Sequence, residues 1–481
     1  MKLKKLIKNL DVVSIIGSTD KDITDVKADS NFITHGSLFI CLKGGEADGH
    51  LYASQAEKYG AVAVICERKI DVNVTQIIVK DTRAALSVIA SEFYGRVDKK
   101  LNLIAVVGTN GKTTTTHMIY DIMTKAGEKC GVVGTLGAFY GDKFIEPTLT
   151  TPDPLVLHKI LADMYSDGVT TVVMEVSAHA IFYEKVKGLA FKVGVFTNFS
   201  RDHLDFFNDL EEYKQVKKSF FKDNKCEFMV VNSDDAVGVE IIGEMERAVT
   251  YGIENPADVF AIKLENDTNG TSFVLNLFDC IYTVKLPLIG RFNVLNALAA
   301  STTSALLGVK TEIIAESLSK LKGASGRLEC VHKSGYSVYV DYAHTPDGLY
   351  KSLSALRPLT KGRLICVFGC GGNRDEGKRR EMGAISGKLA DFTIVTSDNP
   401  RFEDPMEIIR EIELGVLETS KNYLLIEDRE DAIKYALNYA KADDVIIIAG
   451  KGAENYQEIL GIKRLYNDKD TVKEILQGER S

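Results

Sequence analysis

The sequence predicts an α/β protein built from three domains. Short apolar runs of strand length alternate with helix-length segments in two separate stretches of the chain. One of these runs leads through a glycine-rich loop directly into a helix. We therefore expect an N-terminal domain over 1–99, a central domain over 100–328 and a C-terminal domain over 329–481.

Composition and charge argue against several classes of function. Hydrophobic residues make up 45% and charged residues 26%, as in ordinary globular proteins. The net charge of −8 predicts no large basic surface and no nucleic-acid partner. Apolar runs are too short to span a membrane, and polar residues interrupt the basic N-terminus before a signal-type core forms. We expect a cytoplasmic protein without membrane insertion.

The cysteine spacing predicts reduced thiols. The eight cysteines are scattered singly, and no neighbouring Cys or His completes a zinc pattern around the closest pair, Cys366 and Cys370. We expect free and mostly buried thiols.

The first block precedes the glycine-rich loop and is therefore interpreted as an added N-terminal domain. Its apolar runs predict strands at Ser37–Leu42 and Ala61–Cys66. Helices are predicted at Tyr52–Tyr59 and Thr82–Tyr94.

The loop from Gly108 to Thr114 is the strongest functional signal. It follows the apolar run Leu103–Val107 and precedes a helix predicted over Thr115–Lys125. Glycines let backbone N–H groups approach phosphates, and a helix N-terminus favours negative charge. Lys112 would reach the β- and γ-phosphates, and the Thr113 hydroxyl would face Mg²⁺. The loop is shorter than the common GxxxxGK[ST], but its context makes a chance strand-to-helix turn a poor alternative.

The central block continues with a predicted parallel sheet. Strands are predicted at Thr170–Met174, Val193–Phe196 and Phe228–Val231, a β-rich stretch at 257–290, and a helix at Phe292–Leu307. Glu175 ends the first of these strands, where phosphate-loop enzymes place an acid that holds Mg²⁺. The polar run after the second strand contains His203, which the residues alone leave equally open to a metal-binding or a structural role.

A helix predicted over Leu210–Phe221 carries a lysine on its apolar face. Helical spacing puts Lys217 with Tyr213 and Phe220 on that face, while Lys214 and Lys218 point elsewhere. Lys217 either extends to the surface along its apolar stem or lies near the metal site.

The third block predicts a second doubly wound unit with a binding crevice. Its strands are expected at Ser337–Val340, Leu364–Phe368, Phe392–Thr396 and Asp444–Ala449. Charged or glycine-rich loops follow all four strands, and such strand ends share one edge of a parallel sheet. Arg374 and Arg401 suit carboxylates, and Glu454 suits an ammonium group, so we expect a zwitterionic, amino-acid-like ligand. Ordinary charged surface loops would explain each loop separately but not all four.

Nine motifs together resemble the Mur ligases, the ATP-dependent amino-acid ligases of peptidoglycan precursor synthesis. Among these, the chain looks like the tripeptide synthetases, which add the third residue of the stem peptide. The motifs are GTNGKTTTT (Gly108–Thr116), LTTPD (Leu149–Asp153), MEVSAH (Met174–His179), FTNFSRDHLDF (Phe196–Phe206), GRFNVLNALAA (Gly290–Ala300), GRLE (Gly326–Glu329), DYAHTPD (Asp341–Asp347), GCGGNRDEGKR (Gly369–Arg379) and DNPR (Asp398–Arg401).

The resemblance implies a three-domain Mur ligase architecture: an N-terminal UDP-binding domain, a central P-loop ATPase domain and a C-terminal Rossmann-like domain for the incoming amino acid. It assigns ATP binding to Gly108, Thr109, Asn110, Gly111, Lys112, Thr113, Thr114, Asn296, Arg327 and Asp341. It assigns the UDP-muramoyl-dipeptide to Ser30, Gly45, Glu46, Ala47, Thr150, Thr151, Ser177 and Lys185. Amino-acid contacts fall on Arg374, Asp398, Asn399, Pro400, Arg401, Gly450 and Glu454.

The resemblance also implies the chemistry. Thr113, Glu175, His203 and a CO₂-derived carbamate on Lys217 would hold Mg²⁺, and Lys112, Glu175, His203 and Lys217 would be catalytic. ATP would phosphorylate the D-glutamate γ-carboxylate of the dipeptide, and an amine would then attack the acyl phosphate. Arg401 in the DNPR motif favours meso-diaminopimelate, whose distal carboxylate an arginine can bind, over L-lysine or another amino acid. We expect a monomer.

Five positions depart from the family pattern. They are Asn31, Ala178, Tyr183, Lys185 and Ala453, of which all but Ala453 lie in elements that handle the UDP-linked substrate. A paralogue acting on a modified precursor therefore stays open. A folylpolyglutamate-type ligase is disfavoured by the N-terminal domain and the DNPR motif. A non-catalytic nucleotide-binding regulator is disfavoured because Lys112, Glu175, Lys217 and His203 are all present.

Overall fold

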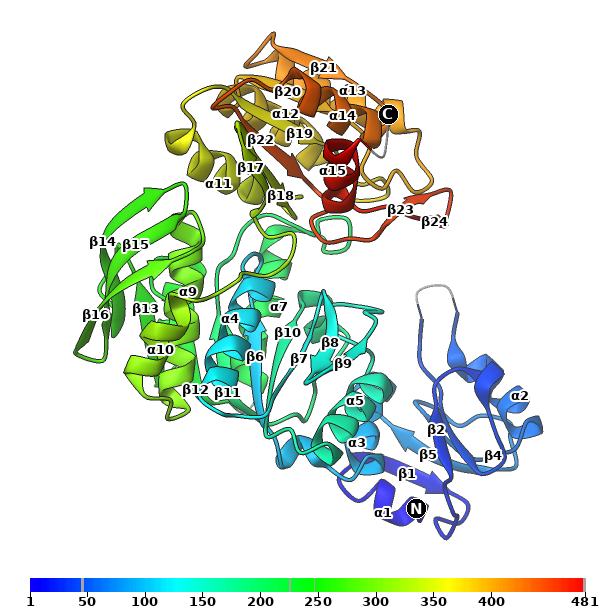
Figure 1. Cartoon of the computed structure of the whole chain (residues 1–481). Coiled ribbons are helices and arrows are strands. Elements are labelled where there is room, and N and C mark those ends of the chain that lie inside the picture. Colours follow the sequence, from blue (N-terminus) through cyan, green and yellow to red (C-terminus); the bar gives the residue numbers. More distant parts are fainter. Residues whose placement is uncertain (45–46, 225, 246, 479–481) are drawn as a thin grey trace. The chain divides into compact units, whose positions relative to one another are not determined.

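The computed structural model describes residues 1–44, 47–224, 226–245 and 247–478 (Figure 1). The chain folds into two compact units whose segments interleave in the sequence. The first comprises Met1–Val107, Gly127–Gly194 and Val216–Glu227, and the second comprises Gly108–Ala126, Val195–Gln215 and Phe228–Ser481.

The first unit begins with a five-stranded sheet in the order β1-β5-β4-β3-β2. The strands are β1 (Val12–Ile16), β2 (Asp25–Lys27), β3 (Ser37–Ile40), β4 (Ala61–Cys66) and β5 (Thr75–Val79), and only β1 pairs antiparallel. Alternate residues of β3 face opposite cores: Leu38 and Ile40 lie in one cluster, and Phe39 lies in the other. The predicted helices are present as α2 (Ala53–Lys58) and α3 (Thr82–Phe93). A short helix, α1 (Leu3–Leu6), precedes β1.

The same unit contains a second, largely parallel group of strands in the order β11-β6-β10-β7-β8-β9. These are β6 (Asn102–Val107), β7 (Cys130–Gly134), β8 (Gly137–Tyr140), β9 (Lys143–Ile145), β10 (Thr171–Val176) and β11 (Phe191–Phe196), with helices α5 (Pro154–Ser166) and α6 (Ala178–Phe182). β10 pairs parallel with both β6 and β7, and its six residues are all buried. A parallel strand buried on both faces reads as a continuous apolar run, which is why the sequence revealed it.

The second unit contains the helix that follows the glycine-rich loop. This helix, α4 (Lys112–Lys125), begins three residues earlier than predicted, and α9 (Arg291–Leu306) is its neighbour. The strands run in the order β16-β15-β14-β13-β12. The elements are β12 (Cys226–Asn232), α8 (Ala236–Glu244), β13 (Ala248–Gly252), β14 (Val259–Asp267), β15 (Gly270–Leu277), β16 (Cys280–Leu286) and α10 (Thr311–Leu318). Three antiparallel strands, β14 to β16, account for the predicted β-rich stretch.

The C-terminal part of the second unit is a doubly wound sheet in the order β17-β18-β22-β19-β20-β21. Its strands are β17 (Glu329–Ser334), β18 (Tyr336–Asp341), β19 (Leu364–Phe368), β20 (Phe392–Val395), β21 (Tyr423–Leu425) and β22 (Val445–Ala449), and all but β17 run parallel. The helices are α11 (Pro346–Leu356), α12 (Gly377–Leu389), α13 (Pro405–Leu417), α14 (Arg429–Tyr439) and α15 (Asp468–Gln477). The hairpin of β23 (Tyr456–Ile459) and β24 (Ile462–Leu465) forms a small separate sheet. One core packs α11, α12 and α13 on one face of the main sheet, and another packs α14 and α15 on the opposite face.

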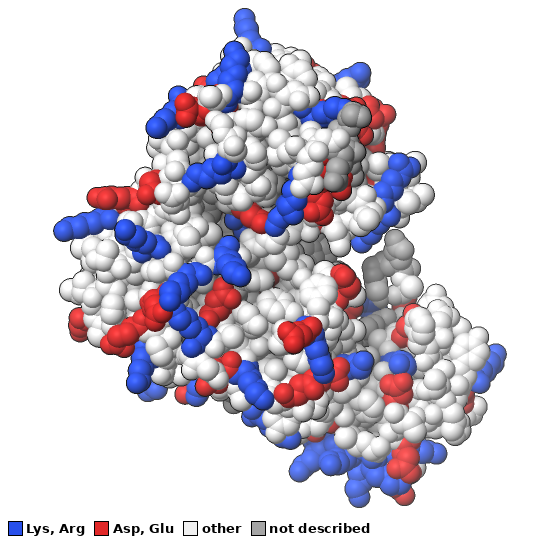
Figure 2. Space-filling view, in the orientation of Figure 1, with Lys and Arg blue, Asp and Glu red and all other residues white. Residues whose placement is uncertain are grey.

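Three composition-based expectations can be compared with the structure. All eight cysteines are free, five of them are buried, and Cys280 and Cys330 are exposed, as predicted for mostly buried thiols. Over the described residues, no helix combines the length and the apolar character that crossing a membrane requires. Figure 2 shows basic and acidic side chains interspersed over the face in view.

Candidate functional site

The glycine-rich loop needs glycine at both of its ends. Gly108 (φ +151°) and Gly111 (φ +84°) adopt backbone angles that other residues rarely adopt. A Cβ at Gly108 would lie 1.9 Å from Thr197 Oγ1, and one at Gly111 would lie 2.4 Å from Asn296 Oδ1. The loop therefore packs so closely on its neighbours that no side chain fits at either position.

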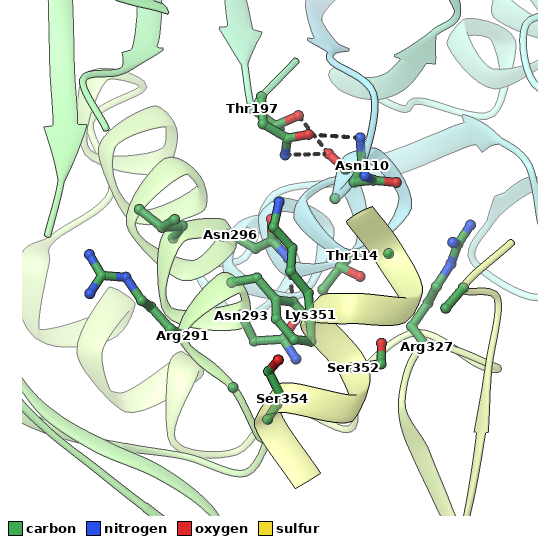
Figure 3. Close-up of a pocket in the computed structure, with 18 of the residues that line it drawn as sticks. Asn110, Thr114, Thr197, Arg291, Asn293, Asn296, Arg327, Lys351, Ser352 and Ser354 are labelled. Carbon is green, nitrogen blue, oxygen red and sulfur yellow. Dashed lines mark hydrogen bonds between the residues drawn. The ribbon is translucent and has the colours of Figure 1, made fainter. Parts of the chain in front are cut away.

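Residues after β11 hold the loop in place. The Thr109 amide donates to the Asn198 carbonyl (2.8 Å), and the Asn110 amide donates to Asn198 Oδ1 (3.0 Å). The Thr197 hydroxyl in turn donates to the Asn110 carbonyl at 2.7 Å (Figure 3), and the Asn198 side-chain Nδ2 donates to the same carbonyl at 2.9 Å. The conformation of the glycine-rich loop is thus fixed by Thr197 and Asn198. The sequence had shown these two residues only as part of a polar run after a predicted strand.

Lys112 and Thr113 occupy the first turn of α4. The Lys112 ammonium folds back over the loop and donates to the carbonyls of Gly108 (3.0 Å) and Thr109 (2.9 Å). The Thr113 hydroxyl accepts a hydrogen bond from the Arg327 guanidinium at 2.8 Å. Two predicted nucleotide residues distant in sequence, Thr113 and Arg327, are therefore in direct contact.

A cavity of about 610 Å³ opens beside the loop (Figure 3). Of the predicted nucleotide residues, it is lined by Asn110, Gly111, Thr113, Thr114, Asn296, Arg327 and Asp341. Further lining residues that the sequence did not single out include Asn293, Tyr342 and Lys351. A cavity of this size, with a phosphate-type loop at one side, has the dimensions of a nucleotide site.

Asp341 and Arg327 shape the cavity wall formed at the end of β18. The buried Asp341 carboxylate accepts hydrogen bonds from the Leu328 amide (3.0 Å), the Tyr342 amide (2.9 Å) and the Ser352 hydroxyl. Burial raises the pKa of Asp341, against the effect of these donors. The Arg327 guanidinium lies over the Tyr342 ring at 4.3 Å. Both side chains are fixed by their neighbours.

A second group of predicted residues meets around Glu175 in the first unit. The Glu175 carboxylate, 2% exposed, accepts hydrogen bonds from the Thr135 amide (2.8 Å) and hydroxyl (3.1 Å). The Thr135 hydroxyl also contacts that of Thr150 at 3.2 Å. The Thr151 hydroxyl donates to the Glu175 carbonyl (2.9 Å) and accepts from the Ser177 amide (3.0 Å). Three predicted dipeptide contacts thus surround the acid.

The departures from the family pattern have local partners here. Lys185 pairs with Asp153 at 2.8 Å, and Arg83 lies 4.4 Å from the Tyr183 ring. Ala178 occupies the first position of α6, capped by the Ser177 side chain. Lys185 therefore keeps a positive charge beside the loop that carries Thr150 and Thr151, although as a point charge rather than a forked donor.

The remaining residues predicted to bind the UDP-linked substrate lie before and after β3 in the sequence. Ser30 is buried in a short 3₁₀ turn, and the backbone amide of the exposed Asn31 donates to Asp29 Oδ1 at 2.9 Å. Ala47 is exposed and directly precedes Asp48. Gly45 and Glu46 lie outside the described residues.

Lys217 lies in α7 (Leu210–Asp223), and His203 lies in the segment that precedes this helix. His203 has a positive φ of +57°, and its Nε2 lies 3.3 Å from the Asp202 carboxylate. Burial by itself raises the pKa of Asp202, but the imidazoles of His203 and His344 lower it to about 2. Lys217 is 1% exposed, which fits its predicted place on the apolar face of the helix and argues against the alternative in which it extends to the surface. The prediction that Lys218 points away was wrong, because Lys218 is 7% exposed and the buried face of α7 is wider than one apolar stripe.

The predicted Mg²⁺ ligands differ in how well they suit this ion. Over the described residues, no group of three or more His, Cys, Asp or Glu side chains forms a metal-binding cluster. The Thr113 hydroxyl and the Glu175 carboxylate are oxygen donors of the kind that Mg²⁺ prefers, whereas the His203 nitrogen is a less common ligand. The oxygen donors fit this ion.

The amino-acid predictions gather at the carboxyl edge of the C-terminal sheet. Glu454 accepts hydrogen bonds from the Lys451 ammonium (3.0 Å) and the Asn399 amide (2.9 Å) on Oε2, while the Tyr342 hydroxyl lies 3.5 Å from Oε1. Asp398 Oδ2 is buried without a hydrogen-bond partner in the described structure. A Cβ at Gly450 would lie 2.4 Å from that oxygen, so only glycine fits opposite it.

Arg401 and Arg374 flank the same crevice. Arg401, 19% exposed, donates from one guanidinium nitrogen to the Gly372 carbonyl (2.7 Å) and pairs through Nε with Glu458 at 3.4 Å. Its positive φ of +54° is sustained by backbone hydrogen bonds to Glu458 and Leu460 of the β23–β24 hairpin. Arg374 is half exposed and lies 3.4 Å from Asp205. Pro400 precedes Arg401, and its carbonyl accepts the Glu403 amide.

Sequence reasoning missed Lys451, the residue that joins Glu454 to Asn399. The only signal in the sequence was its place in the glycine-flanked loop after β22, one of the four strand ends of the predicted crevice. Ala453, where the family usually has histidine, is only partly buried on the same loop.

Family comparisons match three consecutive segments of the chain. Residues 22–94 match "Mur ligase family, catalytic domain", residues 106–304 match "Mur ligase middle domain" and residues 326–452 match "Mur ligase, glutamate ligase domain". The chain is 42% identical to the UDP-N-acetylmuramoyl-L-alanyl-D-glutamate--2,6-diaminopimelate ligase of Bacillus cereus, covering 99% of both chains. It is 44% identical to the Caldanaerobacter subterraneus protein of the same name, again over 99% of both.

Solved structures give the same picture. A structure of a UDP-N-acetylmuramoyl-L-alanyl-D-glutamate--2,6-diaminopimelate ligase is 32% identical, with a TM-score of 0.73 over 100% of this chain and 99% of the other. The folylpolyglutamate synthase of Mycobacterium tuberculosis shares the fold at 17% identity and a TM-score of 0.64, but over only 77% of this chain.

Proposed function

Because this chain belongs to the Mur ligase family, we propose that it is an ATP-dependent ligase that joins meso-diaminopimelate to UDP-N-acetylmuramoyl-L-alanyl-D-glutamate, in peptidoglycan precursor synthesis. The observation that carries this choice of substrate is the crevice where Arg401 and the Glu454–Asn399 pair meet at one sheet edge. A cation and an acid in one crevice suit an amino acid with a charged, carboxylate-bearing distal end.

In the first step, a γ-carboxylate oxygen of D-glutamate attacks the γ-phosphorus of ATP, and ADP leaves. Lys112 and the backbone amides of the loop from Gly108 to Thr114 counter the negative charge on the phosphates. Arg327, held on Tyr342 and bonded to Thr113, adds a second positive charge beside the loop. The products are an acyl phosphate and ADP.

In the second step, the unprotonated amine of diaminopimelate attacks the acyl carbon. The tetrahedral intermediate collapses, the C–O bond to phosphate breaks, phosphate leaves with the electron pair, and the amine proton passes to solvent. Arg401, Asn399 and Glu454 orient the distal end of the amino acid, and Thr150, Thr151, Ser177 and Lys185 contact the dipeptide. Positioning of both reactants is the main contribution of these residues.

Magnesium would be held through the Thr113 hydroxyl and Glu175, with His203 and a carbamate on Lys217 as further ligands. The ion would neutralise charge on the β- and γ-phosphates. Lys217 is 1% exposed, and a carbamate at this position would offer a negatively charged oxygen ligand to the cation. The proposal includes three domains, over 1–99, 100–328 and 329–481, a cytoplasmic location and a monomeric state. The uridine end of the substrate would be bound by Ser30, Gly45, Glu46 and Ala47.

The test is ATP-dependent phosphate release by the purified protein. Each reaction contains ATP, Mg²⁺, the UDP-muramoyl-dipeptide and one amino acid: meso-diaminopimelate, L-lysine, L-ornithine or L-glutamate. Release that needs both the dipeptide and diaminopimelate supports the proposal. A preference for lysine would instead indicate a lysine-adding ligase, and activity with a folate acceptor would indicate a folylpolyglutamate-type ligase. Activity only with a chemically modified dipeptide would indicate a paralogue that acts on a modified precursor.

A further inference from the structure

Lys451 is a lysine with no exposed surface, directly after β22 and between Gly450 and Gly452. Burying an ammonium group is costly unless charged or polar partners compensate it. The partners of Lys451 therefore define what its burial achieves.

The Lys451 ammonium bridges two loops of the crevice. It donates to Asn399 Oδ1 at 2.9 Å and to Glu454 Oε2 at 3.0 Å, and the Tyr456 ring lies 5.5 Å away. Asn399 follows β20, and Glu454 follows β22. One buried charge thus fixes the distance between two side chains that approach from different strands.

The bridge also fixes which atoms face the ligand. Asn399 Oδ1 accepts from both Lys451 and the Glu458 amide (2.9 Å), so its amide nitrogen points to Glu454 Oε2 (2.9 Å). Glu454 Oε2 then carries two hydrogen bonds, and the long 3.5 Å contact with Tyr342 leaves Oε1 as the oxygen with acceptor capacity for an ammonium group.

The charge of Lys451 matters as well as its hydrogen bonds. Asp398, with its buried and unbonded Oδ2, Glu454 and Glu458 place three carboxylates around the crevice, where Lys451 pairs with Glu454 and Arg401 pairs with Glu458. Without Lys451, the Glu454 carboxylate and Asn399 Oδ1 would both lose their charged hydrogen-bond donor.

We propose that Lys451 is a positioning residue for the amino-acid substrate, acting through Glu454 and Asn399 without touching the ligand itself. This inference rests on the proposed function. It predicts that neutralising Lys451 weakens amino-acid binding selectively and leaves the nucleotide site intact.

The experiment compares Lys451→Met, which keeps an unbranched side chain one heavy atom shorter and loses the charge, with Lys469→Met as a matched control. Lys469 is a partly buried lysine of the same domain that pairs with Glu329. Steady-state assays should show the KM for diaminopimelate raised on the order of 10²-fold in Lys451→Met. The KM for ATP should change less than about twofold, and Lys469→Met should resemble the wild type. Thermal stabilisation by diaminopimelate plus nucleotide should fall while that by ADP alone persists.

A double-mutant cycle with Glu454→Gln separates positioning from general destabilisation. If Lys451 acts through Glu454, the two losses should be clearly less than multiplicative. If Lys451→Met does not fold, Lys451→Gln, which keeps one donor, carries the same comparison. Equal changes in both KM values, or independent effects in the cycle, would overturn the inference. A wild type without diaminopimelate-dependent turnover would instead overturn the proposed function.

Discussion

Replacing Arg401 by alanine tests the choice of amino acid most directly. Arg401 is the cation in the DNPR loop, its side chain is four-fifths buried, and its guanidinium is oriented by Gly372 and Glu458. The substitution removes a forked donor for the distal carboxylate and leaves Glu458 as an uncompensated negative charge beside it.

The expected loss follows from this geometry. Removing one partner of a buried charge pair costs about 3–5 kcal/mol, which is on the order of 10²–10³-fold in kcat/KM. Because Arg401 is 19% exposed and already shares its charge with Glu458, we expect the lower end, about 10²-fold. The KM for ATP should stay nearly constant, since Arg401 does not line the nucleotide cavity.

Steady-state rates with diaminopimelate and lysine measure the effect. The ratio of kcat/KM for the two amino acids should shrink in Arg401→Ala, and Arg401→Lys should recover only part of it because ammonium is a point charge. Arg464→Ala, an exposed arginine on the adjacent strand β24, is the matched control. A variant that keeps the full preference for diaminopimelate would refute the role of Arg401.

Three further predictions concern other parts of the chain. Lys112→Ala should lower kcat at saturating ATP by at least about 10²-fold, because a positioned charge at the phosphates is lost; wild-type turnover would contradict this. Lys217→Ala should be nearly inactive and partly rescued by acetate or another short carboxylate. Mass spectrometry of the wild type can test for the carbamate directly. Burial lowers the pKa of His158 to about 4, so the neutral ring is fully stabilising above pH 6.5 and stability falls as the pH drops towards 4. Urea unfolding at pH 5 and 8 should therefore show a smaller difference in the free energy of unfolding for His158→Leu than for the wild type.

The sequence by itself predicted the elements that lie in buried parallel sheets. β4 and β19 were predicted with the observed bounds, since fully buried strands appear as uninterrupted apolar runs between turn residues. The glycine-rich loop and the four charged strand ends were also evident. Parallel strands place their carboxyl ends at one edge, so linear order alone implied that these loops meet.

Tertiary structure decided the contacts that depend on side-chain direction. The order of strands and loops in the sequence could not show that Arg327 reaches Thr113 or that Asn198 fixes the loop. It also could not show that Lys218 is buried beside Lys217. The role of Lys451 likewise depends on β20 and β22 bringing Asn399 and Glu454 to either side of one ammonium. A sequence reports which residues are polar and where strands end, whereas the free energy of burying a charge is set by neighbours that are distant in the chain.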